Sequence, residues 1–149
     1  MHMIIKSINA NDTFTVRHPV LRPDRPIEDC CFELDNHASS LHLGMEFNGE
    51  IIAVLSALPI KSENFPNLTS MRLRGIATLH AFQKKGLGSQ LMIEVEKRLL
   101  KLKKIKLLWL NARISAKPFY QNLGYESMGE TFNIQGVGDH QFMYKKLLE

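Results

Sequence analysis

A short run of residues, Gln83-Lys84-Lys85-Gly86-Leu87-Gly88, has the residue types and spacing to hold an anion. Glycines let the backbone adopt conformations closed to other residues and let it approach a ligand closely. A long amphipathic segment follows, and the first N–H groups of a helix have no partner within that helix. These N–H groups and the positive end of the helix dipole attract phosphate, and the two lysines add mobile positive charge. By itself the run suits a phosphate or pyrophosphate site and a plain tight turn equally well.

Spacing excludes two common phosphate-binding motifs at this position. The run is not a P-loop, because no Gly-Lys-Ser/Thr follows the required four-residue spacer. It does not fit the dinucleotide pattern Gly-x-Gly-x-x-Gly either, because Leu91 stands where the third glycine belongs. A bound anion would have to be held by a different kind of loop.

Hydrophobic periodicity predicts the elements on either side of the run. Residues 69–79 form a strand in which apolar and charged side chains alternate through Met71, Arg72, Leu73 and Arg74. After the run, apolar residues recur three and four positions apart, which predicts a long helix. Its buried stripe comprises Leu87, Leu91, Val95, Leu99 and Leu102.

The other predicted elements alternate between strands and helices. Before the central strand we expect a strand at 3–8, a helix at 9–21 that Pro19 stops, and a hairpin of strands 40–47 and 51–60 joined by Asn48-Gly49. After the long helix we expect a strand at 106–110, a helix at 115–123 ended by Gly124, and closing strands at 126–128 and 141–147. This order predicts an α/β (α+β) fold with a mixed central sheet of about six to seven strands flanked by helices.

Length and composition limit the class of protein. The 149 residues predict one domain over residues 1–149, and 44% hydrophobic with 23% charged residues excludes intrinsic disorder. No apolar run approaches the roughly 18 residues of a membrane span, and the first residues lack the pattern of a signal peptide. Cys30 and Cys31 are adjacent, without a ligand at metal spacing, so we expect reduced thiols, no metal and a cytoplasmic protein.

Much of the formal charge of +4 comes from one basic run, residues 97–106, which contains five lysines and an arginine. Such a run suits a nucleic-acid patch, but it is more typical of the solvated end of a helix. The chain also lacks an aromatic-rich strand of the RNA-binding type. We therefore expect neither a nucleic-acid nor a membrane partner.

The anion-binding run resembles the phosphate loop of the GNAT superfamily of N-acetyltransferases, whose pattern is Gln/Arg-x-x-Gly-x-Gly/Ala. The preceding strand, residues 73–78, fits the acyl-CoA-binding strand of that family. Residues 108–113, and residues 116–125 with their Phe-Tyr-x-x-x-Gly-Tyr sequence, resemble a later strand and helix of the family. The resemblance covers about residues 69–125. Outside it, residues 20–23 and 136–140 are similar to a subgroup of small uncharacterised acetyltransferases.

The resemblance implies acetyl transfer from acetyl-CoA, as co-substrate and without a metal, to a primary amine of a small molecule or peptide. Backbone groups of Ile76, Ala77 and Thr78 would pair with the pantetheine arm as an added strand. The N–H of Ile76 or Ala77 would also stabilise the oxyanion formed when the amine attacks. Backbone N–H groups from Gln83 to Ser89 would hold the pyrophosphate.

Three side chains take roles in the same implied site. Asn111 would hydrogen-bond the pantetheine or shape the gap between strands, and Phe119 would pack near the cofactor. Tyr120 would donate a proton to the departing thiolate. Simpler interpretations stay open, because Tyr120 would also suit a core, Asn111 would suit a helix cap, and Trp109 is expected in the core.

The general base is not identified by the sequence. The strand before the loop offers Arg72 and Arg74, which share a face and either favour an amine bearing carboxylate or phosphate or simply lie at the surface. His80, His140 and Glu63 are alternatives, as is a water-relayed base.

Two other points stay open. The chain could be an acyl-CoA-binding sensor domain of the same fold without turnover. The edges of the predicted sheet are also compatible with a homodimer.

Overall fold

Seven strands and three α-helices are found in residues 2–147, the part of the chain that this computed structural model describes. The strands are β1 (Ile4–Ser7), β2 (Leu41–Phe47), β3 (Glu50–Leu58), β4 (Ser70–Thr78), β5 (Leu107–Arg113), β6 (Glu126–Ile134) and β7 (Gly138–Lys146). They form a mixed sheet in the order β1-β2-β3-β4-β5-β7-β6, in which β4 and β5 are parallel. The predicted fold class is confirmed.

The helices are α1 (Phe14–Leu21), α2 (Leu87–Lys101) and α3 (Lys117–Asn122). Four short 3₁₀ turns accompany them: η1 (Ala10–Thr13), η2 (Ile27–Cys30), η3 (His80–Phe82) and η4 (Ile114–Ala116). By its contacts the chain divides into two compact units, Met1–Pro59 with Leu73–Arg98, and Ile60–Arg72 with Leu99–Glu149. A single domain over residues 1–149 stays a prediction.

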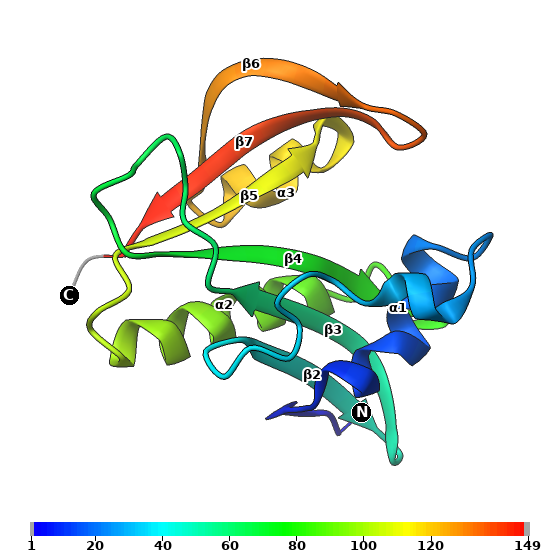
Figure 1. Cartoon of the computed structure of the whole chain (residues 1–149). Helices are drawn as coiled ribbons and strands as arrows, with labels where there is room; N and C mark the ends of the chain where they lie inside the picture. The colour runs from blue at the N-terminus through cyan, green and yellow to red at the C-terminus, as the bar shows by residue number, and fades with distance from the viewer. Residues whose placement is uncertain (1, 148–149) are drawn as a thin grey trace. The chain divides into compact units, whose positions relative to one another are not determined.

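The first unit is built on the hairpin of β2 and β3, which lie side by side in Figure 1. Asn48 and Gly49 connect the two strands with φ angles of +52° and +80°, as the predicted two-residue turn requires. Beyond its first two residues β3 is buried, in agreement with its continuous apolar sequence. Val16 of α1 packs there against Val54 and Ala77, so α1 covers one face of β3 and β4.

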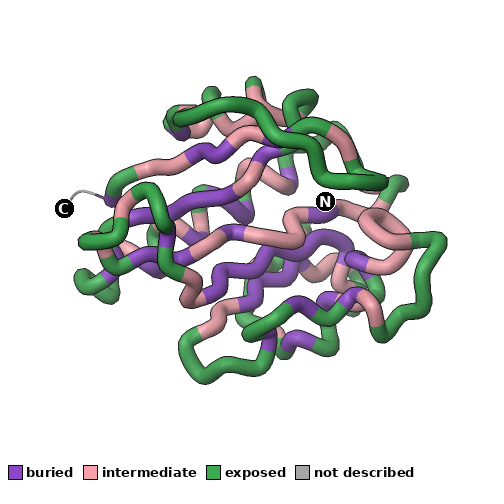
Figure 2. The backbone as a smooth tube through the Cα atoms, turned by 45° about the horizontal axis from the view of Figure 1, so that its top comes forward, coloured by how far each residue is buried: buried purple, intermediate pink, exposed green. Residues whose placement is uncertain are grey.

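The second unit contains an antiparallel ladder in which β7 pairs with both β5 and β6. Its core gathers Leu107, Trp109 and Phe142, and the Trp109 Nε1–H donates to the Ile60 carbonyl at 2.9 Å. The prediction that Trp109 belongs to the core is confirmed. Figure 2 shows the buried middle strands in purple, whereas β6 is exposed along nearly its whole length.

Several predicted bounds are wrong. Pro19 lies inside α1 and does not stop it, because packing of Val16, Val20 and Leu21 on the core outweighs the lost hydrogen bond. Four of the five residues in the predicted apolar stripe of α2 are buried. The fifth, Leu102, lies beyond the end of the helix and is 55% exposed.

The last strands are longer than predicted. β5 continues to Arg113, and β6 and β7 extend to meet in a hairpin around Gly136. These extensions contain polar residues and glycines, and β6 is solvated on both faces, so they show little apolar alternation.

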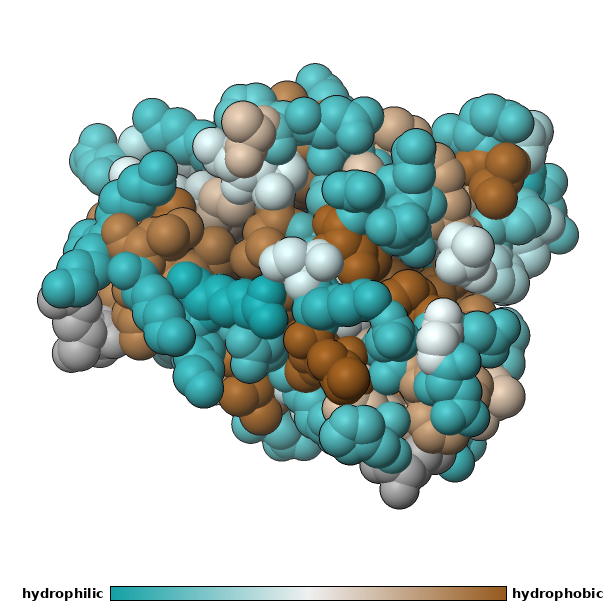
Figure 3. Space-filling model, turned by 90° about the horizontal axis from the view of Figure 1, so that it is seen from below, coloured by the Kyte–Doolittle hydropathy of each residue, from teal (hydrophilic) through white to brown (hydrophobic). Residues whose placement is uncertain are grey.

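Large apolar side chains at the surface are scattered along the chain and include Ile4, Ile93 and Ile114. On the face shown in Figure 3, brown apolar groups are interspersed with teal hydrophilic side chains. Single apolar residues at a surface are ordinary in folded proteins and need no partner to explain them.

Candidate active site

The predicted phosphate loop is an exposed turn directly before α2. Lys84 has φ of +62° and Gly86 has φ of +80°, both in the left-handed region. The Gln90 N–H donates to the Gly86 carbonyl at 3.2 Å, so α2 begins immediately after this glycine. The first turn of α2 contains no acidic residue. The N–H groups at this helix start lack intrahelical acceptors, and the local charge favours an anion.

The loop is tied to the end of β4 by the side chain of Gln83. Its Nε2 donates to the Thr78 carbonyl at 2.9 Å and lies 3.4 Å from His80 Nδ1. Between them, the Leu79 N–H donates to the Ile52 carbonyl of β3 at 2.9 Å. The strand and the loop are therefore held in one local structure, and Ile76, Ala77, Thr78 and residues 83–89 all belong to the first unit.

Gly75 interrupts the regular course of β4 with φ of +67°. A Cβ atom at this position would lie 2.6 Å from the Phe32 ring and 3.3 Å from Arg17 Nε. Only glycine fits both the conformation and the space. This irregularity lies directly before Ile76, the first residue of the predicted pantetheine-binding stretch.

Asn111, Phe119 and Tyr120 belong to the second unit. Asn111 lies within β5 opposite Phe142, and the helical turns that follow are capped by Arg113 and Ala116. The interpretation of Asn111 as a helix cap is therefore wrong, because β5 extends past this residue. Its contact with a ligand stays a prediction.

Tyr120 is partly buried on α3 among other aromatic rings. The Phe119 ring is 5.0 Å from it in edge contact and the Tyr125 ring is 6.2 Å away. Burial raises the pKa of Tyr120 to about 12, against the opposing effect of the Arg113 charge. The phenol therefore stays protonated at neutral pH, which is the state that a proton donor needs.

The two arginines of β4 contact different aromatic rings. Arg72 lies over Trp109 at 5.2 Å, and its buried Nε has no hydrogen-bond partner among the described residues. Desolvation lowers the pKa of Arg72. Arg74 lies over Phe32 at 4.2 Å. The simpler interpretation, that both arginines merely lie at the surface, does not describe them fully, because each guanidinium is stacked on an aromatic face.

The three proposed titratable bases differ in their surroundings. Glu63 and His80 are exposed, whereas His140 is only 5% exposed and its Nδ1 lies 2.8 Å from the Gly138 carbonyl. Register places His140 between Arg113 of β5 and Phe132 of β6. His140 is thus the candidate with a fixed ring orientation.

A buried polar network in the first unit escaped the sequence analysis. Arg17 is 1% exposed and donates to both carboxylate oxygens of Asp35, at 2.6 and 3.0 Å, and to Ser56 Oγ at 2.8 Å. His42 Nδ1 lies 2.6 Å from the same Ser56 Oγ, and its Nε2 donates to the Asp35 carbonyl. The four residues come from separate segments, so no spacing pattern could have revealed them.

Two other kinds of site are not found among residues 2–147. Within residues 2–147, no three His, Cys, Asp or Glu side chains come together as metal ligands could. In the same part of the chain, every helix is too short or too polar to cross a membrane.

Comparison with known families matches residues 30–147 to the acetyltransferase (GNAT) domain. The protein YitI of Bacillus subtilis (strain 168), described as an uncharacterized N-acetyltransferase, is 36% identical over 143 residues. The alignment covers 96% of this chain and 95% of YitI.

Solved structures share the fold at lower sequence identity. Escherichia coli ElaA superposes with a TM-score of 0.78 at 19% identity, over 97% of this chain and 99% of ElaA. An aminoglycoside 6'-N-acetyltransferase solved in complex with coenzyme A has a TM-score of 0.76 at 14% identity, and the match covers 98% of both chains.

Proposed function

The chain belongs to the acetyltransferase (GNAT) domain family, and from this premise we propose that it is an N-acetyltransferase acting by direct attack in a ternary complex. The general reaction of the family moves an acetyl group from acetyl-CoA to an amine. The acceptor proposed here is a primary amine of a small molecule or peptide. Localisation in the cytoplasm is part of the same proposal.

The observation that carries this proposal is the backbone of the phosphate loop. Positive φ angles at Lys84 and Gly86 turn the chain directly into the start of α2. In the proposed complex, the N–H groups from Gln83 to Ser89 donate to the pyrophosphate of acetyl-CoA, and Lys84 and Lys85 neutralise its charge. A Cβ at Gly86 would meet no protein atom within 4 Å, which leaves its backbone open to a ligand.

The pantetheine arm would add to β4 beyond its ladder with β5. That ladder pairs Ser70–Arg72 with Leu107–Trp109, so the proposed partners Ile76, Ala77 and Thr78 come later in the strand. Their backbone groups can accept a strand-like ligand without displacing the β5 residues of this ladder. An N–H from Ile76 or Ala77 would then stabilise the thioester oxyanion.

Tyr120, Asn111 and Phe119 of the second unit have the other proposed roles. The raised pKa keeps the Tyr120 phenol protonated, so it can donate its proton to the CoA thiolate as the C–S bond breaks. Asn111 would hydrogen-bond the pantetheine, and Phe119 would pack against the cofactor. The enzyme's largest contribution would be the proximity of the amine and the thioester.

A second candidate is an acyl-CoA-binding sensor of the same fold that lacks turnover. The observation in its favour is that β4 carries Arg72 and Arg74 and no carboxylate that could act as a base. Such a protein would bind acetyl-CoA through the same loop. It would release no thiol with any amine.

The test is a thermal-shift titration with acetyl-CoA followed by a thiol-release assay with a panel of primary amines. At 100 times Kd, a ligand stabilises the native state by about 2.7 kcal/mol, which raises the Tm of a domain this size by about 5–11 °C. A shift with thiol release supports the enzyme, and a shift without release for every amine supports the sensor. The absence of any shift would contradict both.

A further inference from the structure

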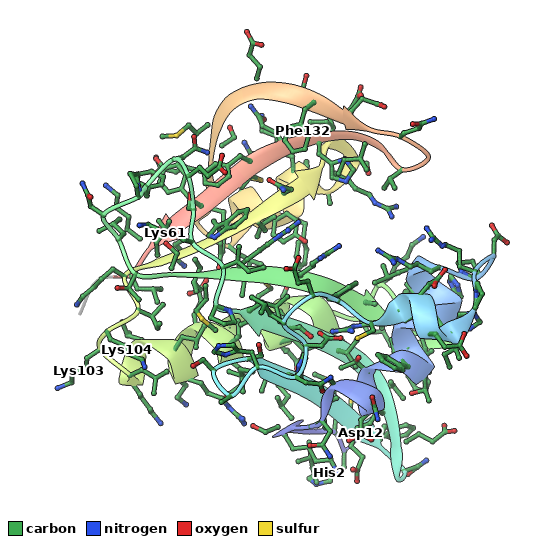
Figure 4. All side chains as sticks on the ribbon, in the orientation of Figure 1. His2, Asp12, Lys61, Lys103, Lys104 and Phe132 are labelled. Carbon is green, nitrogen blue, oxygen red and sulfur yellow. The ribbon has the colours of Figure 1, made fainter. Side chains whose placement is uncertain are left out.

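His140 lies in β7, which pairs with both β5 and β6 in the second unit. The residues directly opposite His140 are Arg113 on β5 and Phe132 on β6. The Phe132 ring, labelled in Figure 4, stacks on the imidazole with a centroid distance of 6.0 Å and an interplanar angle of 25°. Because His140 is only 5% exposed, its ring has a restricted set of orientations.

The hydrogen bond of the ring determines which nitrogen can accept a proton. Nδ1 lies 2.8 Å from the Gly138 carbonyl oxygen, and a carbonyl oxygen can only accept a hydrogen bond. Nδ1 must therefore carry the hydrogen, and the lone pair of the neutral ring is on Nε2. Nε2 is therefore the ring atom that can accept a proton.

His140 shares its face of the sheet with a proposed ligand contact and with an unsatisfied guanidinium nitrogen. Directly paired residues of a sheet share a face, so His140 and Arg113 lie on the same side as Asn111 with Phe142, and Trp109 with Tyr144. Asn111 is a proposed contact of acetyl-CoA. Arg72, with its unsatisfied Nε, lies over Trp109 on this face.

The charged groups around the imidazole come from a few elements. Arg113 of β5 is directly opposite, Glu130 of β6 lies two residues before Phe132, and η4 has no ionisable side chain. The adjacent Asp139 points to the other face of β7, where Asn133 Nδ2 donates to it at 3.0 Å. The hydrogen bond of the ring goes to the Gly138 carbonyl and not to a carboxylate, so it is not an ion pair.

We propose that His140 is the general base of the reaction, a role that rests on the proposed acetyltransferase function. The amine nitrogen attacks the thioester carbon, a C–N bond forms, and the proton lost by nitrogen goes to Nε2 of His140. The C–S bond breaks, its electron pair leaves with sulfur, and the thiolate takes the proton of Tyr120. Solvent then removes the proton from the imidazolium and returns one to the phenolate.

The first test examines the ring itself and needs no acceptor. In ¹⁵N-labelled protein, the nitrogen shifts of the neutral His140 ring should be those of a protonated Nδ1 and a bare Nε2. The signals are assigned in the wild type itself, by through-bond correlation of the ring nitrogens with the His140 backbone in protein that also carries ¹³C. A neutral ring protonated at Nε2 would overturn the proposal, because that nitrogen would then have no lone pair for the amine proton.

The second test measures thiol release from acetyl-CoA with hydroxylamine as the acceptor probe. In His140→Gln the side-chain amide can still donate to the Gly138 carbonyl but cannot take a proton. We expect kcat/KM to fall about 100-fold or more, with acetyl-CoA affinity unchanged. The matched control is His2→Gln, at an exposed histidine labelled in Figure 4, which should behave as the wild type.

The outcomes separate this proposal from the proposed function. If the wild type releases thiol and His140→Gln keeps its rate, His140 is not the base but the transferase function stands. If the wild type neither binds acetyl-CoA nor releases thiol, the proposed function fails and the base role fails with it. If His140→Gln does not fold, the ring tautomer of the wild type still decides the question.

Discussion

Gly86 combines a left-handed backbone with an open position on the Cβ side. Its φ is +80°, a conformation in which a β-branched residue is strained. Replacing Gly86 with Val would both strain the turn and place methyl groups where the pyrophosphate is proposed to approach. We expect Gly86→Val to weaken acetyl-CoA binding at least tenfold, measured by isothermal calorimetry.

The matched control for this change is Gly49→Val in the β2–β3 turn. Gly49 has the same φ of +80° and the same open surroundings, but it is not part of the proposed site. The control variant should lose stability and keep its affinity for acetyl-CoA. Equal losses of affinity in both variants would assign the effect to backbone strain and remove the phosphate-loop role.

Tyr120 is expected to act on turnover and not on binding. Tyr120→Phe keeps the ring contacts with Phe119 and Tyr125 but removes the proton, so kcat should fall about 100-fold or more with acetyl-CoA affinity nearly unchanged. Because the pKa of Tyr120 is raised to about 12, wild-type turnover should show no loss near pH 10 from ionisation of this phenol. Steady-state kinetics against pH measure both effects.

Tyr125→Phe is the control for Tyr120→Phe, since the Tyr125 ring is buried beside Tyr120 and has no proposed proton to give. Its turnover should match the wild type. If Tyr120→Phe lowered affinity as much as turnover, Tyr120 would be a binding residue and not a proton donor.

Residues whose role depends on local backbone were predictable from the sequence. Asn48-Gly49, Gly86 and Gly124 all adopt the positive φ angles that their positions suggested. Gly75 was not singled out, because its requirement comes from Phe32, which approaches it from a distant part of the chain. Long-range contacts of this kind leave no periodic signal in a sequence.

At the scale of elements, the Arg17 network joins α1 to β3 and to the segment before β2. Besides Asp35 and Ser56, Arg17 donates to the Cys30 carbonyl of η2 at 2.9 Å, and its guanidinium lies 3.9 Å from the Phe32 ring centroid. Phe32 in turn contacts Gly75 of β4. The network therefore supports the strand that carries Ile76 to Thr78.

Arg17→Met should be strongly destabilising. The change leaves the Asp35 carboxylate buried without its ion partner, which typically costs about 3–5 kcal/mol in free energy of unfolding. Urea denaturation at pH 7 measures the loss. The control is Arg25→Met, which breaks an exposed ion pair with Asp29 and should cost less than about 1 kcal/mol. Similar losses in the two variants would contradict the importance of the buried network.

The same network predicts a dependence of stability on acid pH. Burial alone would raise the pKa of Asp35, but hydrogen bonds from Arg17 and the Phe32 N–H, with the Arg17 charge, outweigh it and lower the pKa below 3.8. A lowered pKa means that the stabilisation is present above about pH 4 and is lost as pH falls below it. Asp35→Asn should flatten this part of the stability curve, and an unchanged slope would contradict the assignment.

Helices and strands were predicted correctly where apolar periodicity was strong. The predictions failed where tertiary packing or solvent exposure determined the bounds of the element. The strand at β4 and the helix at α2 were predicted nearly to the residue. β6 was mostly missed, because Gly129 and the polar residues around it give an exposed strand without an apolar face. The sequence could not indicate that α1 continues through Pro19, because that depends on its packing partners.

At the scale of the whole molecule, the question is whether general positive charge or a local site attracts acetyl-CoA. Lys103 and Lys104 extend from the turn after α2 (Figure 4), whereas Lys84 and Lys85 precede its start. The fifteen residues of α2 are about 22 Å long, more than two Debye lengths at physiological salt. Charge at the far end should thus contribute little to binding at the start of the helix.

Two double variants with identical net charge test this argument. Lys84→Glu/Lys85→Glu and Lys103→Glu/Lys104→Glu each change the formal charge from +4 to zero, because every exchange removes two units. At 0.15 M salt we expect the first to weaken acetyl-CoA binding at least tenfold and the second to leave it unchanged. At about 0.01 M salt, where the Debye length grows to about 30 Å, the second should also slow association modestly. Equal losses at both salt concentrations would mean that the lysine-rich end of α2 takes part in binding, and the phosphate loop would lose its special role.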